Sequence, residues 1–373
     1  MTRTALVVGG TAATGAPLIQ ELTSRGYDVT VYHRGTHEIP DLAQVEHIHG
    51  DPHFAESIEK DLAGRSWDVT VATYGRIRHL ARSLRGRTGH LVTVSGMPAV
   101  KVLPGVPIDE RDPEADPDSA PAGIGKLLPR ILQTEHEVLD AHRNGHFAAT
   151  VVRYPYVYGP YAVVPAEWHV VRRALDRRPR WILQGAGLAV EGRCAAPNAA
   201  RLIALILDQP GNAGGKVFHA ADDRQYTRRE WVEIVGAAVG HRFEFVDVPA
   251  AIAPLGCSAV PMSGEYTWAD PADVAAGILR HSQVSSAGAR AALGYRDAVN
   301  PAEWMAVTAR HWIDHQPTVD GQVGRMSPEE FDYAAEDRLL AWWDGVLAIA
   351  PDDLRAAPLR GHSYDHPGEK VSK

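Results

Sequence analysis

Residues 5–15 read Ala-Leu-Val-Val-Gly-Gly-Thr-Ala-Ala-Thr-Gly, and an amphipathic stretch, Pro17–Arg25, follows them. The apolar run predicts a buried strand that breaks into a turn of small residues and then enters a helix. Glycines let a backbone approach an anion closely, and the first turn of a helix directs N–H groups toward it. The opening of the chain therefore predicts a loop that holds the pyrophosphate of a dinucleotide. The loop residues expected to contact it are Gly9, Gly10, Thr11, Ala12, Ala13, Thr14 and Gly15.

A second predicted strand, Tyr27–Tyr32, ends in the turn His33-Arg34-Gly35. In a dinucleotide site this strand end meets the adenosine ribose. There an acidic side chain accepts from a free 2′-hydroxyl, or an arginine receives a 2′-phosphate. The turn carries no acid and two basic groups, so His33 and Arg34 favour NADP(H) over NAD(H). The alternative is a solvated turn without a ligand.

Strands and helices alternate through the first 155 residues, which predicts a parallel sheet with right-handed crossovers. We expect an α/β fold: a doubly wound, mostly parallel Rossmann-type sheet of about seven strands, with a smaller C-terminal substrate lobe. A later strand, Lys216–Ala220, returns to the sheet. The strands expected in the first part are Thr4–Val8, Val29–Tyr32, Val45–His49, Asp68–Ala72, Gly89–Ser95 and Ala148–Tyr154.

The same pattern divides the chain. Residues 1–160 form the predicted dinucleotide-binding domain, to which 196–225 return, and residues 161–195 and 226–350 form the substrate lobe. The polar tail 358–373 is expected to be disordered. Ligands of doubly wound sheets bind beyond the carboxyl ends of the strands. Further cofactor candidates at those ends are Asp51, Pro52, Thr73, Tyr74, Gly75, Ser95, Tyr154 and Pro155.

The composition narrows the classes of partner. A formal net charge of -8 argues against an open nucleic-acid binder, and no apolar stretch approaches the length of a membrane span. Two cysteines are too few for a disulfide framework, which favours a reducing, cytoplasmic location. The expected partner is a small-molecule substrate. Tryptophans in the last helical segment, around Trp342 and Trp343, cover the lobe's core or the face of a homodimer.

Eighteen histidines raise the question of a metal site. The densest group is His47-x-His49-x-x-x-His53, in which the first two would share one face of a strand. No cysteine pair or His-Glu-x-x-His element accompanies it, and the alternation of residues 45–50 is that of an ordinary half-exposed strand. We therefore predict no metal site.

Several elements in order resemble the extended short-chain dehydrogenases/reductases, the NAD(P)-dependent epimerase/dehydratase-like family. They are the Gly9–Gly15 loop, Asp51, Ser95, the run Arg153-Tyr154-Pro155-Tyr156-Val157-Tyr158-Gly159-Pro160 and the late Ala292-Leu293-Gly294-Tyr295. The resemblance implies that Asp51 contacts adenine and that the neighbourhood of Pro155 lies along the nicotinamide. It also implies that the segment after Pro160 shapes a substrate pocket. The chain is an atypical member of the pattern.

The chain departs from the family's pattern in the residues that transfer a proton. The family uses Ser or Thr with Tyr-x-x-x-Lys, whereas the interval between Ser95 and His136 contains no tyrosine. Pro129 predicts that the next helix begins near it, which leaves Lys126 in the preceding loop. The catalytic candidates are Lys126, Ser95 and Tyr158. The substrate candidates are Met97, Tyr156, Trp168 and Arg172, the last two sharing a helix face at a spacing of four residues.

Three functions remain open. The first is an NADP(H)-dependent oxidoreductase acting on a carbonyl or alcohol, with an unusual proton donor. The second is a cofactor-assisted isomerase, epimerase or cyclase without net redox change. The third is a dinucleotide sensor without catalysis, similar to the NmrA-like branch, for which the sequence offers no recognisable partner surface.

Overall fold

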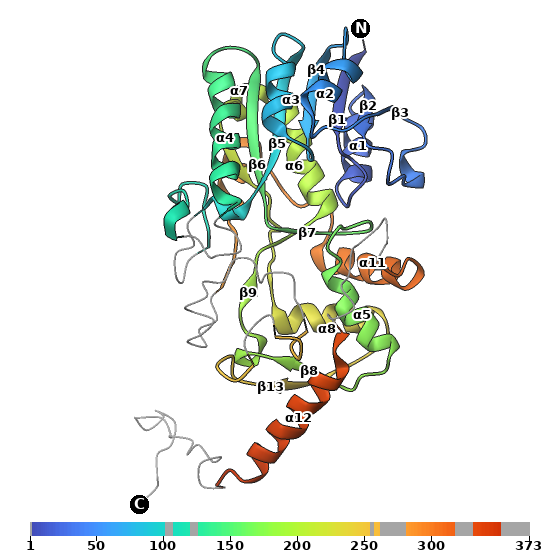
Figure 1. Ribbon diagram of the computed structural model, residues 1–373, viewed down its shortest axis with the longest axis vertical. Coiled ribbons are helices and arrows are strands. Elements are labelled where there is room, and N and C mark those ends of the chain that lie inside the picture. Colours follow the sequence, from blue (N-terminus) through green and yellow to red (C-terminus); the bar gives the residue numbers. More distant parts are fainter. Residues whose placement is uncertain are drawn as a thin grey trace, which may run out of the picture.

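The computed structural model describes residues 2–100, 107–119, 126–253, 257–261, 281–317 and 331–351. Its centre is a seven-stranded sheet in the order β11-β6-β5-β4-β1-β2-β3, in which every pair is parallel (Figure 1). The strands are β1 (Arg3–Val8), β2 (Tyr27–His33), β3 (Glu46–His49), β4 (Trp67–Ala72), β5 (Thr88–Gly96), β6 (Ala148–Tyr154) and β11 (Val217–His219). The predicted doubly wound Rossmann-type sheet is confirmed, including the return of the late strand beside β6.

Helices cover both faces of the sheet, which explains why most residues of its central strands are buried and apolar. In β1, Ala5 and Val7 face a core shared with the helices α1 and α6, whereas Leu6 and Val8 face the opposite core with α2, α3 and α4. These helices are α1 (Gly15–Ser24), α2 (Ala55–Asp61), α3 (Ile77–Ser83), α4 (Leu128–Arg143) and α6 (Ala196–Asp208). As predicted, α4 has proline in its first turn, and Lys126 precedes it.

A second, smaller body lies beyond the carboxyl ends of the strands (Figure 1). It contains α5 (Ala166–Leu175), α8 (Arg228–Ala238) and α11 (Pro301–Asp314), which pack around buried tryptophans. Its described residues also form three short strand pairs: β7 (Tyr156–Tyr158) with β10 (Arg193–Ala195), β9 (Val190–Glu191) with β12 (Tyr226–Thr227), and β8 (Arg180–Leu183) with β13 (Glu244–Asp247). This body is the expected C-terminal lobe.

The remaining helices of the described ranges are α7 (Pro210–Ala213), α10 (Ala287–Leu293) and α12 (Tyr333–Ala348), besides short 3₁₀ turns. Helix α12 extends away from the lobe (Figure 1) and is attached near its start by a fully buried ion pair between Arg173 and Glu336. The tail 358–373 lies outside the described residues. None of the described helices combines the length and apolar character that a bilayer crossing requires.

Candidate active site

The loop between β1 and α1 has a backbone that requires glycine. Gly9 and Gly10 have φ values of +98° and +85°, where other residues are strained. A Cβ atom on Gly15 would lie 1.7 Å from the carbonyl oxygen of Gly10, so the first turn of α1 lies directly against the loop. Thr14 makes no side-chain cap, and the first turn carries no acid. The helix N-terminus is therefore suited to an anion. Thr11 and Ala12 are half-buried and Ala13 is buried.

Arg34, Asp51 and Tyr74 come together from the ends of β2, β3 and β4. The guanidinium carbon of the exposed Arg34 lies 5.4 Å from the centre of the Tyr74 ring. His53 contacts the same ring edge-on, and its Nδ1 lies 2.8 Å from Oδ1 of Asp51. Desolvation raises the pKa of Asp51, but hydrogen bonds from His53 and the charge of Arg34 outweigh it and lower this pKa. The carboxylate is thus ionised beside a guanidinium and an aromatic ring.

Neighbouring strand-end loops are tied to one another. Both the backbone N–H and the hydroxyl of Thr73 donate to the carbonyl of Val8, over 3.0 and 3.1 Å. Gly75 has a φ of +92°, and a Cβ atom there would lie 2.6 Å from Pro52. The carbonyl of Pro52 accepts from the N–H of Arg76 at 2.9 Å. The loops after β1, β3 and β4 therefore form one connected edge.

The expected nicotinamide end lies at β5 and β6. Ser95 is half-buried and pairs in register with Arg153, and the next pair is Gly96 with Tyr154, which Pro155 follows. Burial raises the pKa of Tyr154. This phenol therefore stays protonated across the physiological range.

A buried ion pair below this edge was not predicted. Arg153 donates to Glu135 of α4 over 2.7 and 3.1 Å, and both side chains are nearly inaccessible. Beside them, burial lowers the pKa of His219 to about 4, with a further contribution from the charge of Arg153. Glu135 occupies the apolar face of α4, between Leu132 and Val138. The presence of Glu135 among apolar positions of the helix was the sequence signal that could have predicted a buried, positively charged partner.

The two other candidates for proton transfer have opposite surroundings. Lys126 is exposed in the turn that precedes α4. Tyr158 is fully buried, and its hydroxyl contacts Asp222 at 2.8 Å and the carbonyl oxygen of Pro301 at 3.1 Å. Because this hydroxyl is enclosed by its partners, the structure corrects its assignment as a group that reaches a substrate.

The substrate candidates are not brought together as predicted. Trp168 lies in the core of the lobe with 3% exposure, while Arg172 is exposed and pairs with Asp176 at 2.7 Å. This corrects the expectation that the two line one pocket. The Tyr156 hydroxyl contacts Glu167 at 2.9 Å inside the lobe, and burial raises the pKa of both groups. Met97 is buried in a small apolar cluster next to the end of β5.

A groove of about 690 Å³ runs along the outer side of α1. It is lined by residues of α1, by Pro160 and Tyr161 and by Trp304 of α11. It touches the glycine loop at Ala13 but does not lie over the ends of the central strands. We therefore place the candidate active site at the strand ends and not in this groove.

Solved structures with the same fold identify the class of architecture. No family model matches the chain, and the search of curated proteins returned no match. A dTDP-glucose 4,6-dehydratase from Bacillus anthracis in complex with NAD is 16% identical, with a TM-score of 0.63, and the match covers 84% of this chain and 97% of that one. A UDP-glucose 4-epimerase from Thermotoga maritima with UDP-glucose is 17% identical, with a TM-score of 0.63 and coverages of 84% and 99%. An epimerase from Methanothermobacter thermautotrophicus is 16% identical, with a TM-score of 0.64 and coverages of 84% and 93%.

The chain has the fold of the epimerases and dehydratases. The resemblance inferred from the glycine loop and the Arg153–Pro160 run is confirmed at this level. At such low identities the shared property is the fold alone, because one fold supports many reactions.

Proposed function

We propose that the protein is an NADP(H)-dependent oxidoreductase that acts on a carbonyl or alcohol group of a small metabolite. The observation that carries the proposal is the cradle at the end of β1, where a single Cβ atom on Gly15 would lie 1.7 Å from the carbonyl oxygen of Gly10. A loop that tight, in front of a helix whose first turn carries no acid, has the shape and polarity that a pyrophosphate requires. The NAD complex of a protein with the same fold supports a nicotinamide dinucleotide as the ligand.

In this proposal, residues at different strand ends each bind a different part of the cofactor. The Gly9–Gly15 loop would hold the pyrophosphate, and Asp51 the adenine. Arg34 would hold the 2′-phosphate, because a planar guanidinium can bind phosphate oxygens in pairs, and the Tyr74 ring beside it limits its orientations. Ser95, Tyr154 and Pro155 would flank the nicotinamide. When bound, the cofactor supplies or accepts a hydride.

We assign proton transfer to Lys126 and Ser95. The half-buried hydroxyl of Ser95 lies at the strand end, where it can hold a substrate oxygen by a hydrogen bond. The exposed ammonium group of Lys126, at the entrance of α4, can deliver a proton to that oxygen. The free state of both described cysteines fits the cytoplasmic location that we propose. A homodimer stays a prediction.

The comparisons favour a second candidate in the same site, a cofactor-assisted epimerase or isomerase. Proteins with this fold include epimerases from two further organisms. In that case the hydride would return to the substrate and no reduced cofactor would accumulate. The two candidates share every cofactor-binding residue and differ in the fate of the hydride.

The test has two arms: NADPH deuterated at C4 of the nicotinamide with a panel of carbonyl compounds, and NADP⁺ with a panel of alcohols and sugar nucleotides. Net loss of NADPH absorbance with deuterium in the product supports the oxidoreductase. A changed substrate with no net change in the oxidation state of the cofactor supports the epimerase. Tight NADPH binding with neither outcome across the panel would refute both and support the sensor.

A further inference from the structure

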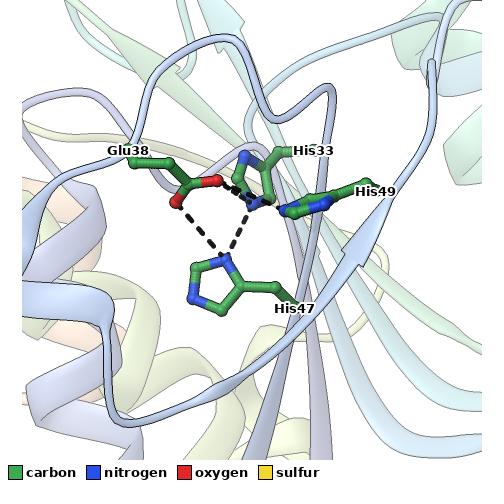
Figure 2. Close-up of side chains that lie close together, drawn as sticks. All are labelled: His33, Glu38, His47 and His49. Carbon is green, nitrogen blue, oxygen red and sulfur yellow. Dashed lines mark hydrogen bonds and ion pairs between the residues drawn. The ribbon is translucent and has the colours of Figure 1, made fainter.

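Three histidines and a glutamate gather at the edge of the sheet, next to the strand-end site, and one of them is His33, which the sequence predicts beside Arg34 at the cofactor's 2′-phosphate. His33 ends β2, and His47 and His49 alternate along β3. In the parallel register His33 pairs with His49, so all three imidazoles project from the same face. Glu38, from the segment after β2, points into the space between them (Figure 2). One potential ligand atom from each of the four lies within 4.8 Å of the others.

The distances match a small coordination sphere. Nε2 of His33 lies 2.8 Å from Nδ1 of His47, and Nε2 of His49 lies 3.2 Å from Oε1 of Glu38. The carboxylate lies 3.7 Å from the ring nitrogens of both His33 and His47. A tetrahedral ion with bonds of about 2.0–2.1 Å separates its ligand atoms by about 3.3–3.4 Å. The four separations lie on both sides of that value.

For His33 and His47, a backbone contact at one ring nitrogen affects whether the other nitrogen can bind an ion. Nε2 of His47 lies 2.9 Å from the carbonyl oxygen of Leu42, which can accept only an N–H. The neutral ring therefore presents the lone pair of Nδ1 to the cluster, an arrangement common in metal-binding histidines. His33 is 3% exposed. An ion would replace the proton between the two rings, and the long 3.3 Å contact of Gly35 N–H with His33 Nδ1 would open.

The charge of the cluster indicates which ion it can take. A phosphate is disfavoured, because the carboxylate of Glu38 stands among the three rings. Imidazole nitrogens and one carboxylate are instead a ligand set that zinc and neighbouring divalent metals accept. We propose that His33, Glu38, His47 and His49 bind one divalent transition-metal ion of the zinc class. Because four protein ligands complete a tetrahedral shell, the ion has a structural role: it clamps the segment between β2 and β3, which begins at Arg34.

This assignment replaces the prediction of no metal site. The sequence cluster paired His47 and His49 with His53, but His53 turns away to Asp51 and Tyr74. The third imidazole comes from the neighbouring strand instead. The proposal does not depend on the proposed enzymatic function, since its test needs neither cofactor nor substrate.

The experiment titrates Co²⁺ into tag-free protein that has been treated with a chelator, and follows visible absorbance. We expect intense tetrahedral bands that saturate at one ion per chain, are bleached by Zn²⁺, and accompany a rise in melting temperature. His49→Ala and Glu38→Gln are the test variants, because these side chains are 59% and 51% exposed and their replacement removes little core packing. Each should weaken binding at least 10–100-fold, the loss that removal of even an outer-shell partner causes.

His53→Ala is the matched control, since it removes a neighbouring histidine that the cluster does not use. It should keep the bands and the affinity, and metal-free His49→Ala should melt close to the metal-free parent. The proposal is overturned if the parent shows no tetrahedral bands. It is equally overturned if His53→Ala weakens binding as much as the test variants, or if they bind as tightly as the parent.

Discussion

Replacing Arg34 by aspartate should reverse the choice between the two nicotinamide cofactors. The guanidinium is exposed at the end of β2 and stacks on Tyr74 with 5.4 Å between its carbon and the ring centre. The substitution removes the cation that we assign to the 2′-phosphate. It also places a carboxylate where a 2′-hydroxyl can donate to it, as in NAD-binding sites.

The expected loss of NADPH affinity depends on how exposed the Arg34 side chain is. A hydrogen bond to a charged group contributes about 1.5–3 kcal/mol, and solvent around an exposed side chain favours the lower end. Arg34→Gln should therefore weaken NADPH about 10–30-fold. In Arg34→Asp, repulsion between the new carboxylate and the phosphate adds about 1 kcal/mol, for a total of roughly 50–150-fold. NADH lacks the phosphate, so its affinity should change less than about 3-fold, a free-energy change below about 0.7 kcal/mol.

Isothermal titration of both cofactors at low and moderate salt measures these ratios. The NADPH affinity of the parent should fall with salt more steeply than that of Arg34→Asp, because screening acts on the lost charge pair. Arg143→Gln, an exposed arginine near the end of α4, is the control and should bind both cofactors as the parent does. Equal weakening of NADPH and NADH by Arg34→Asp, or a parent that prefers NADH, would refute the reasoning.

Three further predictions concern the loop, a buried acid and the last helix. Gly15→Ala, whose Cβ would lie 1.7 Å from a carbonyl oxygen, should abolish NADPH binding in titrations, whereas Gly211→Ala, with open space around its Cβ, should bind normally; equal affinities would contradict the loop assignment. Burial raises the pKa of Asp222 to about 7, whereas the carboxyl group of the unfolded chain ionises at about pH 4. Between these two values only the folded protein holds the proton, so the free energy of unfolding falls as pH rises from about 4 to 7. Relative to Asp222→Asn, the parent should lose up to about 1.4 kcal/mol per pH unit in urea unfolding across that window, and a pH-independent difference would disprove this. Arg173→Met leaves the buried Glu336 with only Arg178, 3.7 Å away, and should cost up to about 3–5 kcal/mol or release α12 to proteolysis. Unchanged unfolding and protease resistance would count against this ion pair as the attachment of α12.

The parts of the fold that the sequence predicted correctly depend on local sequence patterns. The apolar run of β1 is buried on both faces, which follows directly from its unbroken pattern. Pro129 marked the start of α4, because proline is tolerated in a first turn. The strand-end rule predicted that Arg34 and Asp51 lie at the same edge, since parallel strands end together, and the charge of Arg34 does act on Asp51.

The sequence predicted less well which side chains of a helix or strand point into the core and which point to the surface. Trp168 and Arg172 are four residues apart on α5, yet one enters the core and the other pairs with Asp176 at the surface. Tyr158 belongs to the run that most resembles the family, but packing encloses its hydroxyl beside Asp222. Spacing alone does not tell which side of a helix or strand a neighbouring element will cover.

The order of apolar and small residues along the chain was sufficient to predict a doubly wound sheet and an anion-binding first loop, because the alternation of strands and helices and the glycine turn are local patterns. The meeting of His33 with His47 and His49 was decided by the tertiary structure. Their partnership depends on the register between two strands and on the path of the segment that carries Glu38. Register depends on which strand faces are buried against the rest of the protein, so the spacing of histidines within one segment does not reveal their partners on another.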